Sequence, residues 1–148
     1  MILKESLLKF ENFTVLNTVC HYNHGEDITR EQLYSYPIDI DFDILGHQEE
    51  QMFKIVVSVK LNGENMPGYT VSALAATFFR INGDVSEAER NGLLQYSGLQ
   101  MAIANLRAYI ESITYCYPLG KYTLPTIDLN DLLSQKAQIT VERNSNNN

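Results

Sequence analysis

Apolar residues recur along residues 97–117 with the spacing of an amphipathic helix. The apolar positions are three or four residues apart: Leu99, Ile103, Leu106, Ile110 and Ile113. This spacing puts them on one side of an α-helix, as a stripe that must pack against another apolar surface. We therefore expect one long helix over residues 97–117, around which the rest of the chain is organised.

Four segments upstream of this helix have the features of β-strands. In residues 38–44, isoleucines and a phenylalanine alternate with three aspartates, and residues 52–61 carry an apolar side chain at every second position. Residues 68–81 are apolar on both faces. In residues 7–22 the apolar positions change parity midway, which is typical of a strand with a β-bulge. These patterns predict an antiparallel sheet of four strands.

Shorter elements fill the remaining chain. A helical turn is expected near residues 29–33, and Ser86 with Glu89 has the spacing of a capping box at a helix start. We interpret Gly92 and Gly98 as a bend before the long helix, and residues 122–128 as an extended crossover. A last short helix is expected over Asp131 to Ala137, with Asp128 or Asn130 as its cap.

The predicted fold is α+β: a four-stranded antiparallel sheet with one long helix packed on one face and short helices around it. Residues 1–140 are expected to form a single domain, followed by an asparagine-rich, disordered tail over residues 141–148. Residues 68–81 need cover on both faces. Either the face away from the helix meets a second subunit, or its small alanines tolerate water.

Composition and charge exclude some partners. The formal charge of −7 and the pI near 4.8 argue against nucleic acid binding, because no basic patch offsets phosphate repulsion. No apolar run approaches a membrane span, and the first residues lack a signal-peptide pattern. Cys20 and Cys116 lie in different predicted elements, so we expect no disulfide framework and a cytoplasmic location.

The sequence contains little that indicates catalysis. Cys20, His21 and His24 are close in sequence, but a metal site would need further ligands, and we interpret them as surface or core residues. Cys116 is expected to be a buried, inert thiol. We find no glycine-rich phosphate loop, nucleophile elbow or zinc signature. We therefore expect no catalytic residue, no metal and no cofactor.

Two surface features leave alternatives open. Asp39, Asp41 and Asp43, which we call the acidic row, point to one side of their strand, with Lys54 and Lys60 expected to face them from the next strand. The acidic row is either a solvated face or a docking surface for a partner. Aromatic and apolar residues gather over residues 109–129, and they either pack in the core or line a groove for apolar peptides.

The order of these features resembles the SecB family of protein-export chaperones over residues 10–135. The strand pair of residues 37–43 and 53–64 carries part of the resemblance, and Phe-Phe-Arg-Ile at 78–81 resembles the family's Ile-Phe-x-Ile. Leu-Arg-Ala-Tyr-Ile at 106–110 resembles Ala-Arg-x-x-Ile. After Gly120, residues 124–132 (Leu-Pro-Thr-Ile-Asp-Leu-Asn-Asp-Leu) are similar to Leu-x-Pro-Val/Ile-Asn-Phe-x-x-Leu.

The resemblance implies a non-enzymatic homotetramer, a dimer of dimers, that binds unfolded chains destined for export. The groove candidates carried over by position are Phe42, Ile44, Tyr122, Leu124, Ile127 and Leu129. It also implies docking to the translocase motor SecA through an acidic surface. Ser72 stands roughly where that surface has an acidic residue in the family, and the acidic row Asp39, Asp41 and Asp43 is the candidate replacement.

Three functional hypotheses follow. The first is an ATP-independent chaperone that holds unfolded polypeptides. The second is a dedicated interaction module on the same fold, such as a chaperone for one toxin–antitoxin pair. The third is an enzyme such as a thioesterase, in which a sheet wraps a central helix. Here the long helix follows the predicted strands and carries no obvious base or nucleophile, which disfavours the enzyme.

Overall fold

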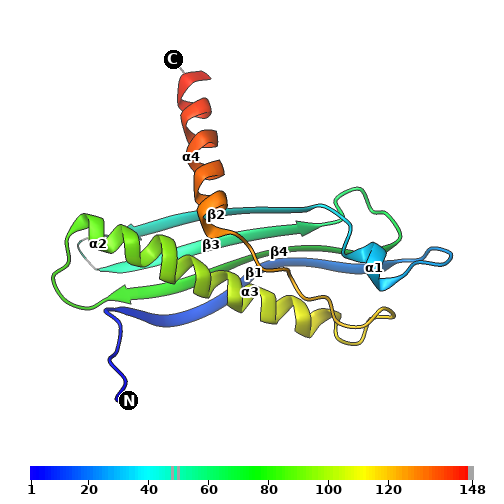
Figure 1. Ribbon diagram of the computed structural model, residues 1–148, viewed down its shortest axis with the longest axis horizontal. Coiled ribbons are helices and arrows are strands. Elements are labelled where there is room, and N and C mark those ends of the chain that lie inside the picture. The colour runs from blue at the N-terminus through cyan, green and yellow to red at the C-terminus, as the bar shows by residue number, and fades with distance from the viewer. Residues whose placement is uncertain (48, 50, 147–148) are drawn as a thin grey trace.

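The computed structural model describes residues 1–47, 49 and 51–146, and its long helix lies across one face of an antiparallel sheet (Figure 1). The four strands run in the order β1-β4-β3-β2 across the sheet. Their bounds are β1 (Leu8–Asn23), β2 (Ile38–His47), β3 (Met52–Leu61) and β4 (Gly68–Ile81). The predicted α+β fold is confirmed.

The first strand is bulged, as its change of parity predicts. β1 pairs with β4 along its whole length, from Leu8 opposite Ile81 to Asn23 opposite Gly68. The register shifts twice, between Phe10 and Asn12 and between Val15 and Asn17. Each extra residue moves the following side chains to the other face, so β1 keeps apolar residues toward the core on both sides of the shifts.

The long helix begins earlier than expected. α2 (Glu87–Gly92), the π-helical segment η1 (Leu93–Gly98) and α3 (Leu99–Thr114) follow one another without a break, giving a helix of 28 residues. The expected bend between Gly92 and Gly98 is wrong, because both glycines have helical backbone angles. A Cβ on Gly98 would lie 2.9 Å from Ile55 Cδ1, so this glycine lets the helix approach β3 closely.

The π-helical segment has a packing consequence. Leu94 and Leu99 are both buried although they are five residues apart. In an α-helix of 3.6 residues per turn, such residues point about 140° apart. The wider π-turn, whose hydrogen bonds span five residues, brings both side chains to the core side.

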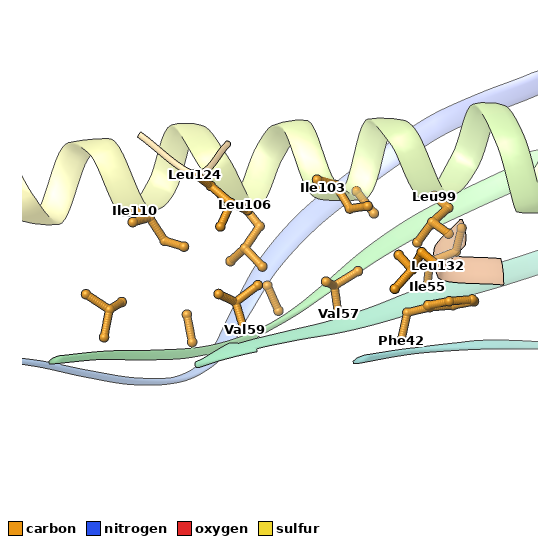
Figure 2. Packing of buried hydrophobic residues seen from close by; sticks show 14 of the residues in the cluster. Phe42, Ile55, Val57, Val59, Leu99, Ile103, Leu106, Ile110, Leu124 and Leu132 are labelled. Carbon is orange, nitrogen blue, oxygen red and sulfur yellow. The ribbon is translucent and has the colours of Figure 1, made fainter. Parts of the chain in front are cut away.

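The core lies between α3 and the sheet. Figure 2 shows the predicted stripe of α3 facing side chains of β3, with Leu99, Ile103, Leu106 and Ile110 toward Ile55, Val57 and Val59. All seven of these side chains are buried, whereas Ile113 at the end of the stripe is only half-buried. The stripe and the sheet face that it was expected to cover are therefore confirmed.

The remaining helices are α1 (Arg30–Leu33) and α4 (Leu129–Asn146). Thr29 and Gln32 form a capping box at the start of α1. Asp128 Oδ1 accepts hydrogen bonds from the first N–H groups of α4, as expected of its cap. α4 extends nine residues beyond the predicted end at Ala137.

Figure 1 shows α4 running away from the sheet. The side chains of residues 137–145 are exposed. The expected disorder of residues 141–148 stays a prediction. Residues 141–146 form the end of α4, and residues 147–148 lie outside the described part.

Candidate functional site

The crossover, residues 122–128, is held against α3 by an arginine. Arg107 Nε donates to the Leu124 carbonyl oxygen at 2.7 Å, and Nη2 donates to the Pro125 carbonyl oxygen at 3.0 Å. A guanidinium presents its donors in a fixed fork, and hydrogen bonds from a charged donor are stronger than neutral ones. Arg107 therefore fixes the distance between the crossover and the long helix.

A second set of contacts holds the chain just before the crossover. Tyr69 of β4 donates from its hydroxyl to the Gly120 carbonyl oxygen and accepts from the Leu119 N–H, both at 2.7 Å. The ring of Tyr117 lies edge-on to Tyr69, with centroids 5.3 Å apart. The hydroxyl of Tyr117 in turn donates to the Cys20 carbonyl oxygen. Tyr69 and Tyr117 thus fasten residues 117–120 to the sheet.

Three of the six groove candidates belong to the buried core, and two of them, Tyr122 and Leu124, border neither hollow described below. Tyr122 and Leu124 are 2% and 1% exposed. The Tyr122 ring stacks on Tyr34 at 4.8 Å, and its backbone N–H donates to Thr114 Oγ1. Burial, with a smaller contribution from Tyr34, raises the pKa of Tyr122 to about 12. These two side chains do not line an open surface in this structure, because the crossover turns them toward the sheet.

Phe42 and Ile44 line a hollow of about 430 Å³ between β2 and α4, which we call the β2–α4 hollow. The other residues around it are Asp43, Gln95, Leu133, Lys136, Ala137 and Thr140. Phe42 is 6% exposed, and Ile44 is half-buried. Most of the surface in this hollow is apolar.

Ile127 and Leu129 line a second hollow of about 180 Å³ between α3 and the crossover, which we call the α3–crossover hollow. Its other residues are Gln100, Ile103, Ala104, Arg107 and Thr126. The two hollows flank the start of α4, since Leu129 borders one and Leu133 the other. Four of the six groove candidates therefore lie beside open space, in two neighbouring hollows.

Of the two lysines expected to face the acidic row, Lys60 lies opposite one of its aspartates, but Lys54 lies opposite Leu45. Lys136 of α4 reaches Asp41 Oδ1 at 2.7 Å and Asp43 Oδ1 at 3.1 Å. Partial burial raises the pKa of Asp41. Hydrogen bonds from Lys136 and from the Phe42 N–H lower it by more, so the pKa lies below its usual value. In the register of the sheet, Asp39 lies opposite Lys60.

The structure places the two cysteines in different surroundings. Burial raises the pKa of the Cys20 thiol, which disfavours the thiolate. Cys116, expected to be buried, is exposed. The described part of the chain brings no three His, Cys, Asp or Glu side chains close enough to hold a metal ion. Within residues 1–47, 49 and 51–146, no helix combines the length and apolarity needed to cross a membrane.

Comparison with known proteins identifies the fold. No protein-family model matches the sequence, and no curated protein matches it significantly. Among solved structures, the chain is similar to the SecB-like chaperone Rv1957 of Mycobacterium tuberculosis in complex with a ChAD peptide from the Rv1956 HigA1 antitoxin. The two chains are 15% identical with a TM-score of 0.59, over 82% of this chain and 91% of that one.

The chain has a divergent SecB-like fold. It also matches a protein of unknown function from Streptococcus agalactiae, with 14% identity and a TM-score of 0.46, over 80% of this chain and 97% of that one. On the SecB-like fold of this chain, the long helix follows all four strands, and the two hollows open beside the helix that comes after the crossover.

Sequence reasoning missed five residues that line the β2–α4 hollow, among them Gln95, Leu133 and Lys136. Gln95 reaches it from the π-helical segment, which was interpreted as a bend. Leu133 and Lys136 reach it from α4. Their spacing of three residues puts them on the same side of a helix as Leu129 and Leu132, and this periodicity is the signal that could have identified them.

Proposed function

We propose that this protein is an ATP-independent chaperone that binds extended apolar segments of unfolded polypeptides in the two hollows beside α4. The observation that carries the proposal is the pair of open hollows with Phe42, Ile44, Ile127 and Leu129 on a SecB-like fold. Unfolded chains expose apolar and aromatic side chains, which shallow apolar surfaces bind without reading a sequence. The proposed chaperone performs no chemistry and needs no cofactor.

The neighbouring structure favours a second candidate. Rv1957 is named as a SecB-like chaperone and its complex holds a peptide from an antitoxin. By analogy, this protein would serve a single partner, such as the antitoxin of one toxin–antitoxin pair. A dedicated chaperone binds one partner tightly and leaves a generic denatured client to aggregate, so the same aggregation assay separates the two candidates.

We further propose that the chain assembles as a homotetramer. The outward side of α3 supports an interface between copies, because its exposed side chains beyond the α3–crossover hollow, Met101, Ala108 and Ser112, carry no charge. β1 is an edge strand of 16 residues, which offers a second surface for pairing. Solution mass tests this proposal: a tetramer has four times the mass of the 16.8 kDa chain.

A cytoplasmic location and a role in export complete the proposal. Export would require docking to the motor SecA, for which the acidic row is the proposed surface. Asp41 and Asp43 are already paired with Lys136, so docking there competes with α4. Binding of purified SecA to the wild type and to an Asp39→Asn variant tests this part separately from client binding.

The central experiment measures aggregation of a chemically denatured client without nucleotide. The wild type is expected to suppress aggregation, and Ile44→Ser and Ile127→Ser are each expected to weaken suppression, because both side chains border the hollows. Ile139→Ser is the matched control, since Ile139 lies outside both hollows on α4 and is 42% exposed. Substitution of Tyr122 or Leu124 is not informative here, because loss of either buried side chain would destabilise the fold. Failure of the wild type to suppress aggregation refutes general chaperone activity.

A further inference from the structure

Three asparagines in this chain are each followed by a glycine. The pairs are Asn62-Gly63, Asn82-Gly83 and Asn91-Gly92. Glycine has no side chain to shield its backbone nitrogen, so this nitrogen can approach the side-chain carbonyl carbon of the asparagine before it. The shared dipeptide gives the three asparagines a similar intrinsic reactivity. The fold places them in three different environments, which decide whether the side chain can reach the nitrogen.

The first pair is held by hydrogen bonds. Asn62 is 2% exposed, and its Nδ2 donates to the carbonyl oxygens of Met66 and Tyr69 at 2.7 and 3.1 Å. Its Oδ1 accepts from the Met66 N–H at 2.9 Å. Rotation of this side chain toward the Gly63 nitrogen would break all three hydrogen bonds, and buried polar groups are costly to leave without partners. The fold therefore protects Asn62.

The third pair lies inside the long helix. Asn91 is exposed, but it belongs to α2, and Gly92 has helical backbone angles, with φ −61° and ψ −45°. The Gly92 N–H lies beyond the first turn of the helix, so the helix provides it with a carbonyl acceptor one turn earlier. A ring closed between the Asn91 side chain and this nitrogen would require rotating the backbone away from its helical angles. The helix therefore protects Asn91.

The second pair has neither protection. Asn82 and Gly83 are exposed and lie between β4 and α2. Among residues 1–47, 49 and 51–146, no hydrogen bond engages the Asn82 side chain or the Gly83 N–H. A Cβ on Gly83 would meet only Leu7 Cδ2, at 4.0 Å, so the space beside its nitrogen is open. The backbone of Asn82 is meanwhile anchored, because its N–H donates to the Leu7 carbonyl oxygen at 2.9 Å.

We propose that Asn82 is a site of spontaneous deamidation, and that the fold confines this modification to Asn82 among the three Asn-Gly pairs. The Gly83 nitrogen loses its proton to a solvent base and attacks Cγ of Asn82. The new N–Cγ bond replaces the Cγ–Nδ2 bond, and Nδ2 takes a proton from solvent and leaves as ammonia. Water then opens the resulting cyclic imide at either of its carbonyl carbons. Opening at one carbon gives aspartate, and opening at the other gives isoaspartate, in which the main chain runs through the former side chain.

The modification changes both the charge and the end of the sheet. Either product adds a negative charge to a chain whose net charge is already −7. Isoaspartate also lengthens the main chain by one carbon just before Gly83. Gln51 Nε2 donates to the Gly83 carbonyl oxygen at 3.2 Å, and the Gln51 carbonyl oxygen accepts from the Ile81 N–H at 3.0 Å. The longer chain displaces the Gly83 carbonyl and thereby loosens the contact between the start of β3 and the end of β4.

The test ages the purified chain in mildly alkaline buffer and follows the three Asn-Gly peptides by mass spectrometry after digestion. Conversion of the amide to an acid changes the peptide mass, and fragmentation distinguishes isoaspartate from aspartate. We expect conversion in the folded protein to be at least about tenfold faster at Asn82 than at Asn62 or Asn91, which corresponds to about 1.4 kcal/mol of protection. In urea, where the fold is lost, the three rates should become similar. This convergence separates protection by the fold from the effect of the dipeptide.

Two variants complete the test. Asn82→Ser removes the proposed site and should remove most of the acidic species that accumulates in ion-exchange chromatography of the aged protein. Asn91→Ser changes another exposed asparagine and should leave that accumulation at its wild-type rate. Equal rates at all three asparagines in the folded protein, or faster conversion at Asn62 or Asn91 than at Asn82, overturn the proposal. So does an intact Asn82 after a period in which the unfolded chain is fully converted.

Discussion

Two hydrogen bonds from Arg107, which we call the clamp, hold the crossover against α3 beside the α3–crossover hollow. Arg107→Met keeps much of the apolar stem of the side chain and removes the two hydrogen bonds to the carbonyl oxygens of Leu124 and Pro125. Hydrogen bonds from charged groups contribute about 1.5–3 kcal/mol each when buried, and one of these two bonds is solvent-exposed. We therefore expect a loss of about 2 kcal/mol in the free energy that holds the crossover against α3.

This loss should be local. Hydrogen exchange of the backbone amides in residues 122–128 should become about thirtyfold faster, since 1.4 kcal/mol corresponds to a factor of ten. Exchange in the paired strands β3 and β4 should change little. Arg80→Met is the matched control: Arg80 forms an exposed ion pair with Glu11, and its removal should cost less than about 0.5 kcal/mol. Equal exchange of the crossover in Arg107→Met and in the wild type would refute the clamp.

Three further substitutions or conditions test the packing. Thr114→Val leaves the buried N–H of Tyr122 without its acceptor and should lower the free energy of unfolding by about 1–3 kcal/mol in urea titrations. Gly98→Ala puts a methyl group 2.9 Å from the buried Ile55 Cδ1, at an overpacking cost of about 1–3 kcal/mol that the higher helix propensity of alanine offsets by about 1 kcal/mol, so the unfolding midpoint should fall slightly. The pKa of Asp41 is lowered in the folded state. Its ion pair with Lys136 therefore stabilises the contact with α4 fully above pH 3.8, the usual pKa of the group, and this stabilisation is lost as the pH falls through the folded-state pKa. Hydrogen exchange of the α4 amides should accelerate over that pH range.

The parts of the fold that the sequence predicted are those set by local periodicity. The alternation in residues 38–44 and 52–61 requires one buried face, and the three-four spacing of the α3 stripe requires a sheet beneath it. The change of parity in β1 likewise predicted its bulges, because a bulge is the way a strand can change parity without leaving the sheet.

Close approach between elements was harder to predict. Gly92 and Gly98 were interpreted as a bend because glycine is common where chains turn. Gly98 is needed instead for contact between the helix and Ile55, which depends on a neighbour 43 positions away in sequence. The burial of Tyr122 and Leu124 has the same origin, since spacing does not distinguish a groove wall from core packing.

The charge partner of the acidic row is also a long-range feature. Lys136 and Asp41 are 95 residues apart, and no local pattern connects them. The asparagine-rich end indicated a disordered tail, because such a segment has little apolar surface to bury. Lys136 lies inside the helix predicted over Asp131 to Ala137, so the helix was expected there but its contact with the edge of the sheet was not.

The most direct test of client binding is to locate a bound unfolded polypeptide on the protein by NMR. Isotope-labelled protein would be titrated with an unfolded, aromatic-rich polypeptide without nucleotide, and shift changes followed residue by residue. We expect the largest changes at Ile44, Leu133, Ile127 and Leu129, the residues that border the two hollows. Saturable binding that changes only the sheet face opposite α3, or no binding at all, would contradict the proposed function.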